Sequence, residues 1–159
     1  MTNAFIKIFE PVFEEEKKKW QKENEVECVK AALGNSDNFA AMDLDVQQNL
    51  PAYAAWIAKA TKTVRPTQLR RFYTHVKVLC RKARDEDTGS LDPRTKAKLK
   101  FLLPKLAGTV KKKEEGLFNL YEVFALCIQT HNKIRCKADL DSFIDFFEAI
   151  LDYLSLIHI

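Results

Sequence analysis

One stretch of the chain constrains its fold class more than any other feature. Between residues 69 and 83, apolar side chains recur at the i, i+3, i+4, i+7 spacing of an amphipathic helix. These residues are Leu69, Phe72, Tyr73, Val76, Leu79, Cys80 and Ala83. The chain has only four glycines, and the stretches between them show the same period without strand-like alternation. The sequence therefore predicts an all-α fold, a single-domain bundle of about five to six helices over residues 1–159.

The expected helices span residues 11–33, 51–62, 67–83, 93–106, 117–132 and 138–155. Gly34 is expected to end the first helix, and the polar segment 35–49 to form a loop or a short helix. Thr67 and Asp92 have the positions of N-caps, because a proline stands next to each. Pro104 is expected to kink or break its helix.

The charge of the chain is divided unevenly along its length. Residues 59–113 hold 17 Lys and Arg against four Asp and Glu, a net charge of +13, whereas the rest holds nine against 18, a net charge of −9. Between Val46 and Arg84 there is no acidic residue. A surface of one sign attracts polyanions and guides their approach, so this segment predicts a nucleic-acid partner, with an acidic protein surface as the second choice.

The basic residues fall into rows when the expected helices are drawn as wheels. One narrow arc beside the apolar stripe carries Arg70, Lys77, Arg81 and Arg84. On the next helix Lys98, Lys105 and Lys112 recur every seven residues. A solvated helix face usually mixes charges, and neither row does so. The candidate nucleic-acid-binding residues are Lys62, Arg65, Gln68, Arg70, Arg71, Lys77, Arg81, Arg84, Lys98, Lys105 and Lys112.

Arg70 and Arg71 lie in the first turn after Thr67, where the helix dipole disfavours cations. The same turn favours a phosphate, which arginine binds in bidentate fashion, so this turn is a candidate phosphate clamp. Arg70 could equally pair with an acid of the C-terminal helix. The residues alone do not decide between these two roles.

The last expected helix carries two apolar stripes. The first consists of Leu140, Phe143, Phe147, Leu151 and Leu154, and the second of Phe146, Ile150, Tyr153 and Ile157. Either this helix is central in its own domain, or the second stripe faces another subunit, because a large exposed apolar patch normally marks an interface. The second stripe is therefore the candidate interface, and self-association is expected.

The main interpretation assigns no catalytic or metal-binding residue, because the sequence has no paired carboxylates and no metal-ligand cluster, and no cofactor is expected. No Gly-rich phosphate loop and no CxxC pair are present. The four cysteines are interpreted as small buried residues. No run approaches the roughly 18 apolar residues that span a membrane, and the start of the chain lacks the pattern of a secretory signal. We expect a cytoplasmic protein without a membrane partner.

Three blocks of the sequence resemble, in order and spacing, motifs of one protein family. Residues 65–73 (RPTQLRRFY) resemble T-x-Q-[LI]-R-K-F, residues 99–107 (LKFLLPKLA) resemble L-x-x-L-x-P-K-L-A-Y, and residues 143–153 (FIDFFEAILDY) resemble F-x-x-[FY]-[FM]-E-A-[IL]-[VL]-A-Y. This family is the small helical subunit of type III-A CRISPR effector (Csm) complexes. The resemblance spans residues 64–154, the family-like core, whereas residues 1–63 match poorly.

The resemblance implies a non-catalytic RNA-binding subunit of an antiviral defence complex, stacked in several copies. Its implied partners are the backbones of the guide RNA and the target RNA, and the other subunits of the effector complex. In that family the carboxylates that cleave the target lie on other subunits. A duplex selected by base pairing needs only backbone and shape contacts from protein, which rows of Lys and Arg supply.

Two alternatives remain open. Arg70 and His75 have the R-x4–6-H spacing of HEPN-type ribonucleases, although the two side chains lie about 140° apart around a helix. The other alternative is a helical adapter for an acidic protein. RNA cleavage that is lost in His75→Ala would favour the ribonuclease, and salt-sensitive binding without cleavage would favour the subunit.

Overall fold

The computed structural model describes residues 25–109, 115–130 and 132–158. Its elements are α2 (Glu25–Gly34), η1 (Phe39–Ala41), α3 (Leu44–Ala60), α4 (Pro66–Lys82), α5 (Pro93–Thr109), α6 (Glu115–Ala125), a π-helical turn η2 (Leu126–Thr130) and α7 (Lys137–Ile157). The described residues form no strand beyond an isolated bridge between Asp85 and Leu91. The predicted all-α bundle is confirmed. The first half of the helix expected over residues 11–33 lies outside the described residues.

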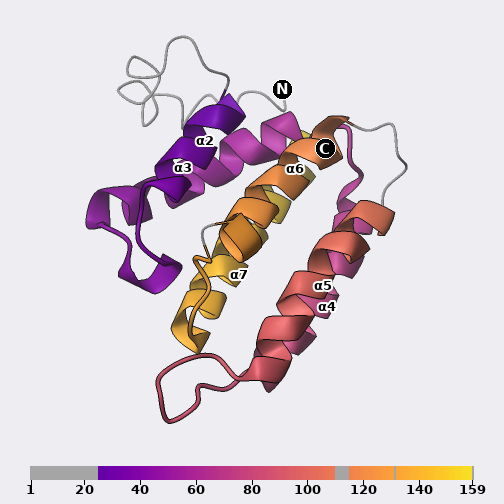
Figure 1. The fold of residues 1–159 in the computed structure, drawn as a ribbon. Coiled ribbons are helices and arrows are strands. Elements are labelled where there is room, and N and C mark those ends of the chain that lie inside the picture. The colour runs from indigo at the N-terminus through magenta and orange to yellow at the C-terminus, as the bar shows by residue number, and fades with distance from the viewer. Residues whose placement is uncertain (1–24, 110–114, 131, 159) are drawn as a thin grey trace.

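Helix α7 is the central element, and this position explains its two apolar stripes. Figure 1 shows α6 and α7 between the α2–α3 pair and the α4–α5 pair. One stripe packs on α4 and α6, where the Phe147 ring lies 5.7 Å from Phe72 and 4.9 Å from Phe124. The other stripe faces η1 and α3, where the Phe146 ring lies 6.1 Å from Phe39. Both stripes are therefore covered largely by other elements of the same chain.

Helix α3 begins at Leu44, well before the predicted start at Pro51. Pro51 lies inside the helix and is exposed, and α3 continues through it although the proline removes one backbone hydrogen bond. The half of α3 that follows Pro51 is buried on all sides from Ala52 to Ala58. Its alanines allow α2, α6 and α7 to approach it closely. The first part of α3 was not predicted because residues 35–49 are polar and lack a clear helical period.

Helix α4 also begins earlier than expected. Arg65 is its N-cap, in extended conformation, and Pro66 occupies the first helical position, so the prediction that Thr67 is the cap is wrong. The missing N–H of a proline costs nothing in the first turn of a helix, which is why the helix starts there. Of the predicted stripe, Leu69, Phe72, Val76, Leu79 and Ala83 are buried, and Tyr73 and Cys80 are half-buried.

Helix α5 starts as predicted. The Asp92 carboxylate accepts hydrogen bonds from the backbone N–H of Thr95 at 3.1 Å, from its hydroxyl at 2.7 Å and from the Arg84 N–H at 3.0 Å. These bonds, that from Arg84 above all, lower the pKa of Asp92 to about 2. Pro104 was expected to kink or break the helix; it does not break it, because α5 continues to Thr109. Pro104 is exposed, so the freed carbonyl of the preceding turn can bind water.

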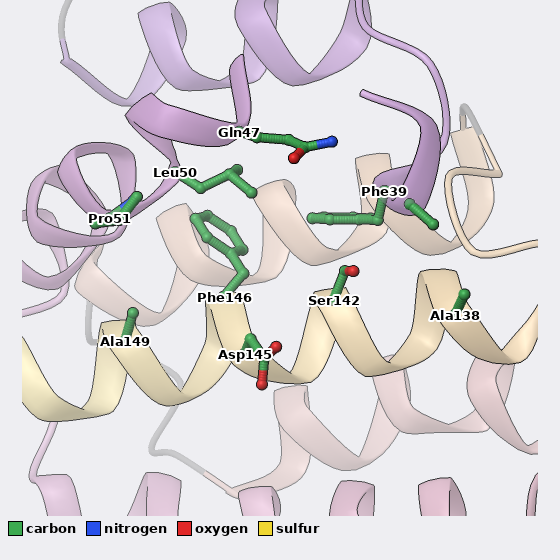
Figure 2. A pocket seen from close by; sticks show the side chains of 10 residues that line it. Phe39, Gln47, Leu50, Pro51, Ala138, Ser142, Asp145, Phe146 and Ala149 are labelled. Atoms are coloured by element: carbon green, nitrogen blue, oxygen red, sulfur yellow. The ribbon is translucent and has the colours of Figure 1, made fainter. Parts of the chain in front are cut away.

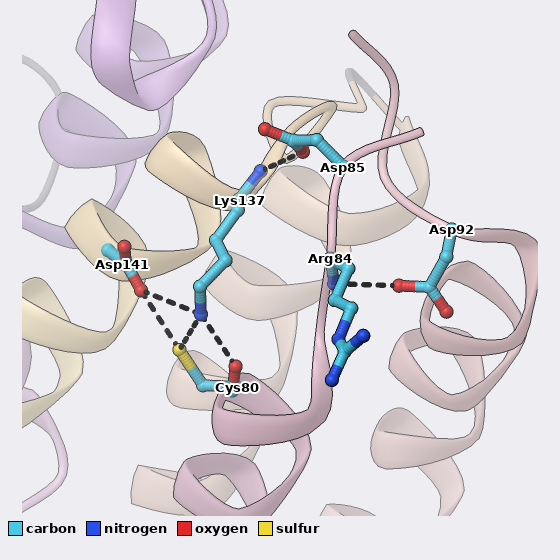
Figure 3. Close-up of polar contacts among 6 residues, drawn as sticks. All are labelled: Cys80, Arg84, Asp85, Asp92, Lys137 and Asp141. Atoms are coloured by element: carbon cyan, nitrogen blue, oxygen red, sulfur yellow. Dashed lines mark hydrogen bonds and ion pairs between the residues drawn. The ribbon is translucent and has the colours of Figure 1, made fainter. Parts of the chain in front are cut away.

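Polar contacts join the α4–α5 hairpin to the start of α7 (Figure 3). The Lys137 ammonium donates to the Cys80 carbonyl at 2.8 Å and lies 3.7 Å from the Asp141 carboxylate, while the Lys137 backbone N–H donates to Asp85 at 2.7 Å. Burial raises the pKa of the Cys80 thiol to about 11, and Asp141 adds to the rise, so the thiol stays protonated. Cys28 and Cys127 are buried, and Cys80 and Cys136 are half-buried.

A buried carboxylate lies at the same end of α7 as Lys137. Asp139, in the first turn of α7, has no exposed surface and accepts hydrogen bonds from the Asn38 amide at 2.7 and 2.8 Å and from the Ala40 N–H at 2.7 Å. The N–H of Arg135 donates to it at 2.9 Å. Burial raises the pKa of Asp139, but these hydrogen bonds outweigh burial, so its pKa lies below the ordinary value. The residue thus ties η1 and the preceding loop to α7.

Candidate nucleic-acid interface

The basic residues of the sequence come together on the paired helices α4 and α5. The two helices pack against each other (Figure 1). Each carries five Lys or Arg and no Asp or Glu. All ten basic side chains are exposed: Arg70, Arg71, Lys77, Arg81, Lys82, Arg94, Lys96, Lys98, Lys100 and Lys105. This arrangement gives one side of the bundle a surface of a single sign, suited to a polyanion.

A groove of about 250 Å³ runs between the two helices. We call it the α4–α5 groove; it is lined by His75, Val78, Leu79, Lys82, Lys98, Phe101, Leu102 and Lys105. The buried side chains of Leu79 and Leu102 form its floor. Lys82 comes from α4, and Lys98 and Lys105 from α5, so residues distant in the sequence share one rim. Lys98 and Lys105 were predicted as RNA-binding residues, whereas Lys82 was not among the predicted residues.

The outer row of α4 consists of Arg70, Lys77 and Arg81, as the helical wheel predicted. The Lys77 ammonium lies 5.5 Å from the centre of the Tyr73 ring, a cation–π contact. The Arg70 guanidinium donates a hydrogen bond of 2.8 Å to the hydroxyl of Ser155 on α7. One of the two roles left open for Arg70 was a pair with an acid of the C-terminal helix; Arg70 contacts that helix, but its partner is a hydroxyl and not an acid.

The start of α4 offers less to a phosphate than the sequence suggested. The Arg65 carbonyl accepts from the N–H of Gln68 at 3.1 Å and from that of Leu69 at 3.4 Å, so these two amides are already used. Lys62 and Arg65 are exposed and Gln68 is half-buried. A phosphate bound at this turn would rely on side chains, chiefly those of arginine, and not on backbone amides.

Of the two remaining candidates, Arg84 lies at the edge of the surface. Arg84 is exposed, but it is followed directly by the exposed acids Asp85, Glu86 and Asp87, which lower the positive potential there. The backbone N–H of Arg84 donates a hydrogen bond to the Asp92 carboxylate (Figure 3). Lys112 lies outside the described residues.

The two residues of the ribonuclease alternative lie on different sides of α4. Arg70 points toward α7, where it bonds Ser155, whereas His75 lines the α4–α5 groove. The structure does not bring the guanidinium and the imidazole of one chain together, although an acid–base pair needs both groups at one reacting atom. Within the described ranges, no group of three or more His, Cys, Asp or Glu side chains could hold a metal ion.

The second apolar stripe of α7, the predicted subunit interface, is largely core. Phe146, Ile150 and Tyr153 are buried and Ile157 is half-buried. Figure 2 shows the Phe146 ring between α7 and α3, close to Phe39 and Leu50. The central position of α7 explains this burial, so the argument that the stripe needs another subunit to cover it is wrong.

A hollow of about 390 Å³ beside Phe146 differs in charge from the α4–α5 groove (Figure 2). Its lining contains Gln47, Ser142 and Asp145 but no Lys or Arg. Asp145 belongs to a row of exposed acids on α7: Asp141, Asp145, Glu148 and Asp152. Burial raises the pKa of Tyr73 to about 12, and the carboxylates of this row add to the rise. The acidic row therefore borders α4 close to Tyr73, where Lys77 also lies, and it lowers the positive potential at that edge of the basic surface.

Sequence reasoning missed the most exposed aromatic residue among those described, Phe101, which lines the α4–α5 groove and is 69% exposed. Its neighbours Leu99, Leu102 and Leu103 are buried. The sequence could have indicated this exposure, because Phe101 does not fall on the face of the helix that carries those leucines. Val78, 40% exposed, lines the same groove from α4.

Comparison with known proteins identifies one family. The family model described as Csm2 Type III-A matches residues 45–158, well over half of the chain. The match includes most of α3 as well as α4 to α7, so it begins earlier than the predicted core of residues 64–154. No curated protein and no solved structure matches the chain significantly. None of the helices described here is both long and apolar enough to span a bilayer.

Proposed function

Since the chain belongs to the Csm2 Type III-A family and is a small subunit of a type III-A CRISPR complex, we propose that its α4–α5 surface contacts the backbone of the guide and target RNA. The protein has no catalytic role in this proposal. The observation that carries it is the charge of two packed helices that together present ten exposed Lys and Arg without a single acid.

The Lys and Arg side chains of this surface favour contact with the RNA backbone over contact with the bases. Lys and Arg bind phosphate oxygens, and such contacts fix position without reading sequence. In an effector complex the guide supplies sequence by base pairing, so the protein needs only charge and shape. The surface therefore has what a guide-dependent complex requires from a small subunit.

Salt dependence of RNA binding by the purified chain tests the proposal. If about four phosphates are neutralised, the slope of log K against log salt for single-stranded RNA should be near −3. We expect Lys98→Gln with Lys105→Gln to weaken binding and to make this slope less steep by about 1.4, which corresponds to two lost contacts. A slope near zero for the unchanged protein would contradict the proposal.

The matched control uses the other side of the same helix. Lys96 and Lys100 are exposed and line a different hollow, together with Ile128 and Ile134. Lys96→Gln with Lys100→Gln removes the same charge from the same helix, so we expect a smaller loss of affinity from this pair. Equal losses would show that net charge, and not the α4–α5 groove, determines binding.

Assembly in several copies belongs to the same proposal. The acidic row of α7 and the basic α4–α5 pair give one copy two surfaces of opposite charge, which favours head-to-tail contact over a self-complementary dimer. Sedimentation at several salt concentrations tests this proposal. Association that weakens as salt rises supports it, and a monomer at all concentrations and at low salt contradicts it.

A further inference from the structure

Phe101 is an exposed aromatic side chain that lines a groove with a basic rim. Single exposed apolar side chains are common on protein surfaces and need no explanation. Among the described residues, however, the exposed large apolar side chains are Leu44, Val78 and Phe101, and two of these three line the α4–α5 groove. The groove thus combines an accessible phenyl ring, an accessible valine and a basic rim.

The charges around Phe101 limit what can cover it. Lys98 and Lys105 stand three residues before and four residues after Phe101, so both lie on its side of α5, about 10 Å apart along the helix axis. Lys82 and His75 line the groove from α4, and no acid takes part in the lining. A ligand with both an apolar face and negative charge fits this set, and a nucleotide with an unstacked base has both.

We propose that Phe101 is a stacking platform for an unpaired base, while Lys98 and Lys105 hold the adjoining phosphates. This inference rests on the proposed function, because it assigns one feature of the RNA to one side chain of the same surface. Bases of a single strand stack on exposed aromatic rings independently of sequence, since every base has a π-face. In a duplex the base faces are covered by their neighbours, so the groove binds unpaired RNA in preference to duplex.

The size of the groove agrees with contact to one base. Its volume of about 250 Å³ is below the roughly 300–1,000 Å³ of pockets that enclose a drug-sized molecule. The Phe101 ring lies at its rim, and Leu79 and Leu102 close the floor. A base resting on the ring would cover Phe101 and reach toward Val78.

The experiment compares Phe101→Ala, Phe101→Leu and Phe101→Trp in the purified chain. The probes are a short oligoadenylate and a duplex of equal length. We expect the alanine and leucine variants to bind the single strand about fivefold to a hundredfold more weakly, with little change for the duplex, and tryptophan to retain binding. Leucine keeps apolar contact but removes the ring, so it separates stacking from simple burial. In Phe101→Trp, the added indole fluorescence should change when oligoadenylate binds.

Other outcomes overturn the inference in distinguishable ways. If the Phe101 variants bind both probes normally while Lys98→Gln with Lys105→Gln weakens both, the stacking role fails and the proposed function stands. If the unchanged chain binds neither probe at low salt, both fail. If Phe101→Ala binds RNA normally but no longer joins the effector complex, Phe101 is a protein contact and the stacking role is wrong.

Discussion

Arg70 on α4 and Ser155 on α7 are joined by a hydrogen bond of 2.8 Å between the guanidinium and the hydroxyl oxygen. The bond links the basic surface to the central helix. It uses one of the five N–H donors of the guanidinium, and the arginine stays exposed. Arg70 can therefore contact α7 and still offer donors to a phosphate, so the two roles that the sequence left open do not exclude each other.

Arg70→Ala should weaken RNA binding but change the free energy of unfolding by no more than about 0.5 kcal/mol, because the residue and its hydrogen bond are exposed. RNA titration and urea unfolding of the same preparation measure both effects. Ser155→Ala is the matched control, since it removes the bond and keeps the charge. If Ser155→Ala reduced RNA affinity as much as Arg70→Ala, the arginine would act by positioning α7 and not by binding phosphate.

The local sequence predicted the parts of the fold that depend on apolar period and on caps. The stripe from Leu69 to Ala83 was found by its spacing, and the cap at Asp92 by the proline that follows it. The early start of α3 was not predictable in the same way, because residues 44–50 are mostly exposed and pack on the core through Val46 and Leu50. Tertiary packing overrides weak local propensity in such segments.

The charge pattern of the candidate site could be predicted from the sequence, but the α4–α5 groove could not. The rows containing Lys77 and Lys98 were read from helical spacing, and the structure places both on the α4–α5 pair. That Lys82 joins Lys98 and Lys105 around one groove depends on how α4 and α5 pack. The stripe containing Phe146 was ambiguous for the opposite reason, because a central helix and a subunit interface produce the same apolar pattern.

Asp139→Ala should lower the free energy of unfolding by on the order of 3 kcal/mol, because it leaves the Asn38 amide and the N–H groups of Ala40 and Arg135 without their buried acceptor. Urea unfolding at pH 7 measures the loss. Asp141→Ala, an exposed acid on the same helix, is the control and should change stability far less.

The contribution of Asp139 should also depend on pH. Its folded pKa is lowered, so the stabilisation is present above the unfolded pKa of about 3.9 and is lost as pH falls from there toward the folded pKa. The difference in unfolding free energy between the unchanged chain and Asp139→Asn should therefore shrink below about pH 4. A difference that stays constant down to pH 3 would show that the charge of Asp139 contributes nothing.

The purified chain should leave RNA intact, and His75→Ala should not change this. The physical reason is the separation of Arg70, which bonds α7, from His75, which lines the α4–α5 groove. Incubation of labelled RNA with the chain, followed by gel analysis, measures turnover. Cleavage that disappears in both His75→Ala and Arg70→Ala would contradict the expectation and support the ribonuclease alternative.

Phe146→Ala and Phe101→Ala make the same chemical change at a buried and at an exposed site. Phe146 is 2% exposed and lies against Phe39, so its loss leaves a cavity and should lower the free energy of unfolding by about 3–5 kcal/mol. Phe101 is 69% exposed, so the same substitution there should cost within about 0.5 kcal/mol. Thermal or urea unfolding of the isolated chain compares the two directly. If Phe146→Ala proved neutral in the isolated chain but prevented assembly of the complex, the stripe would be an interface after all, and the packing of α3 on α7 described here would be wrong.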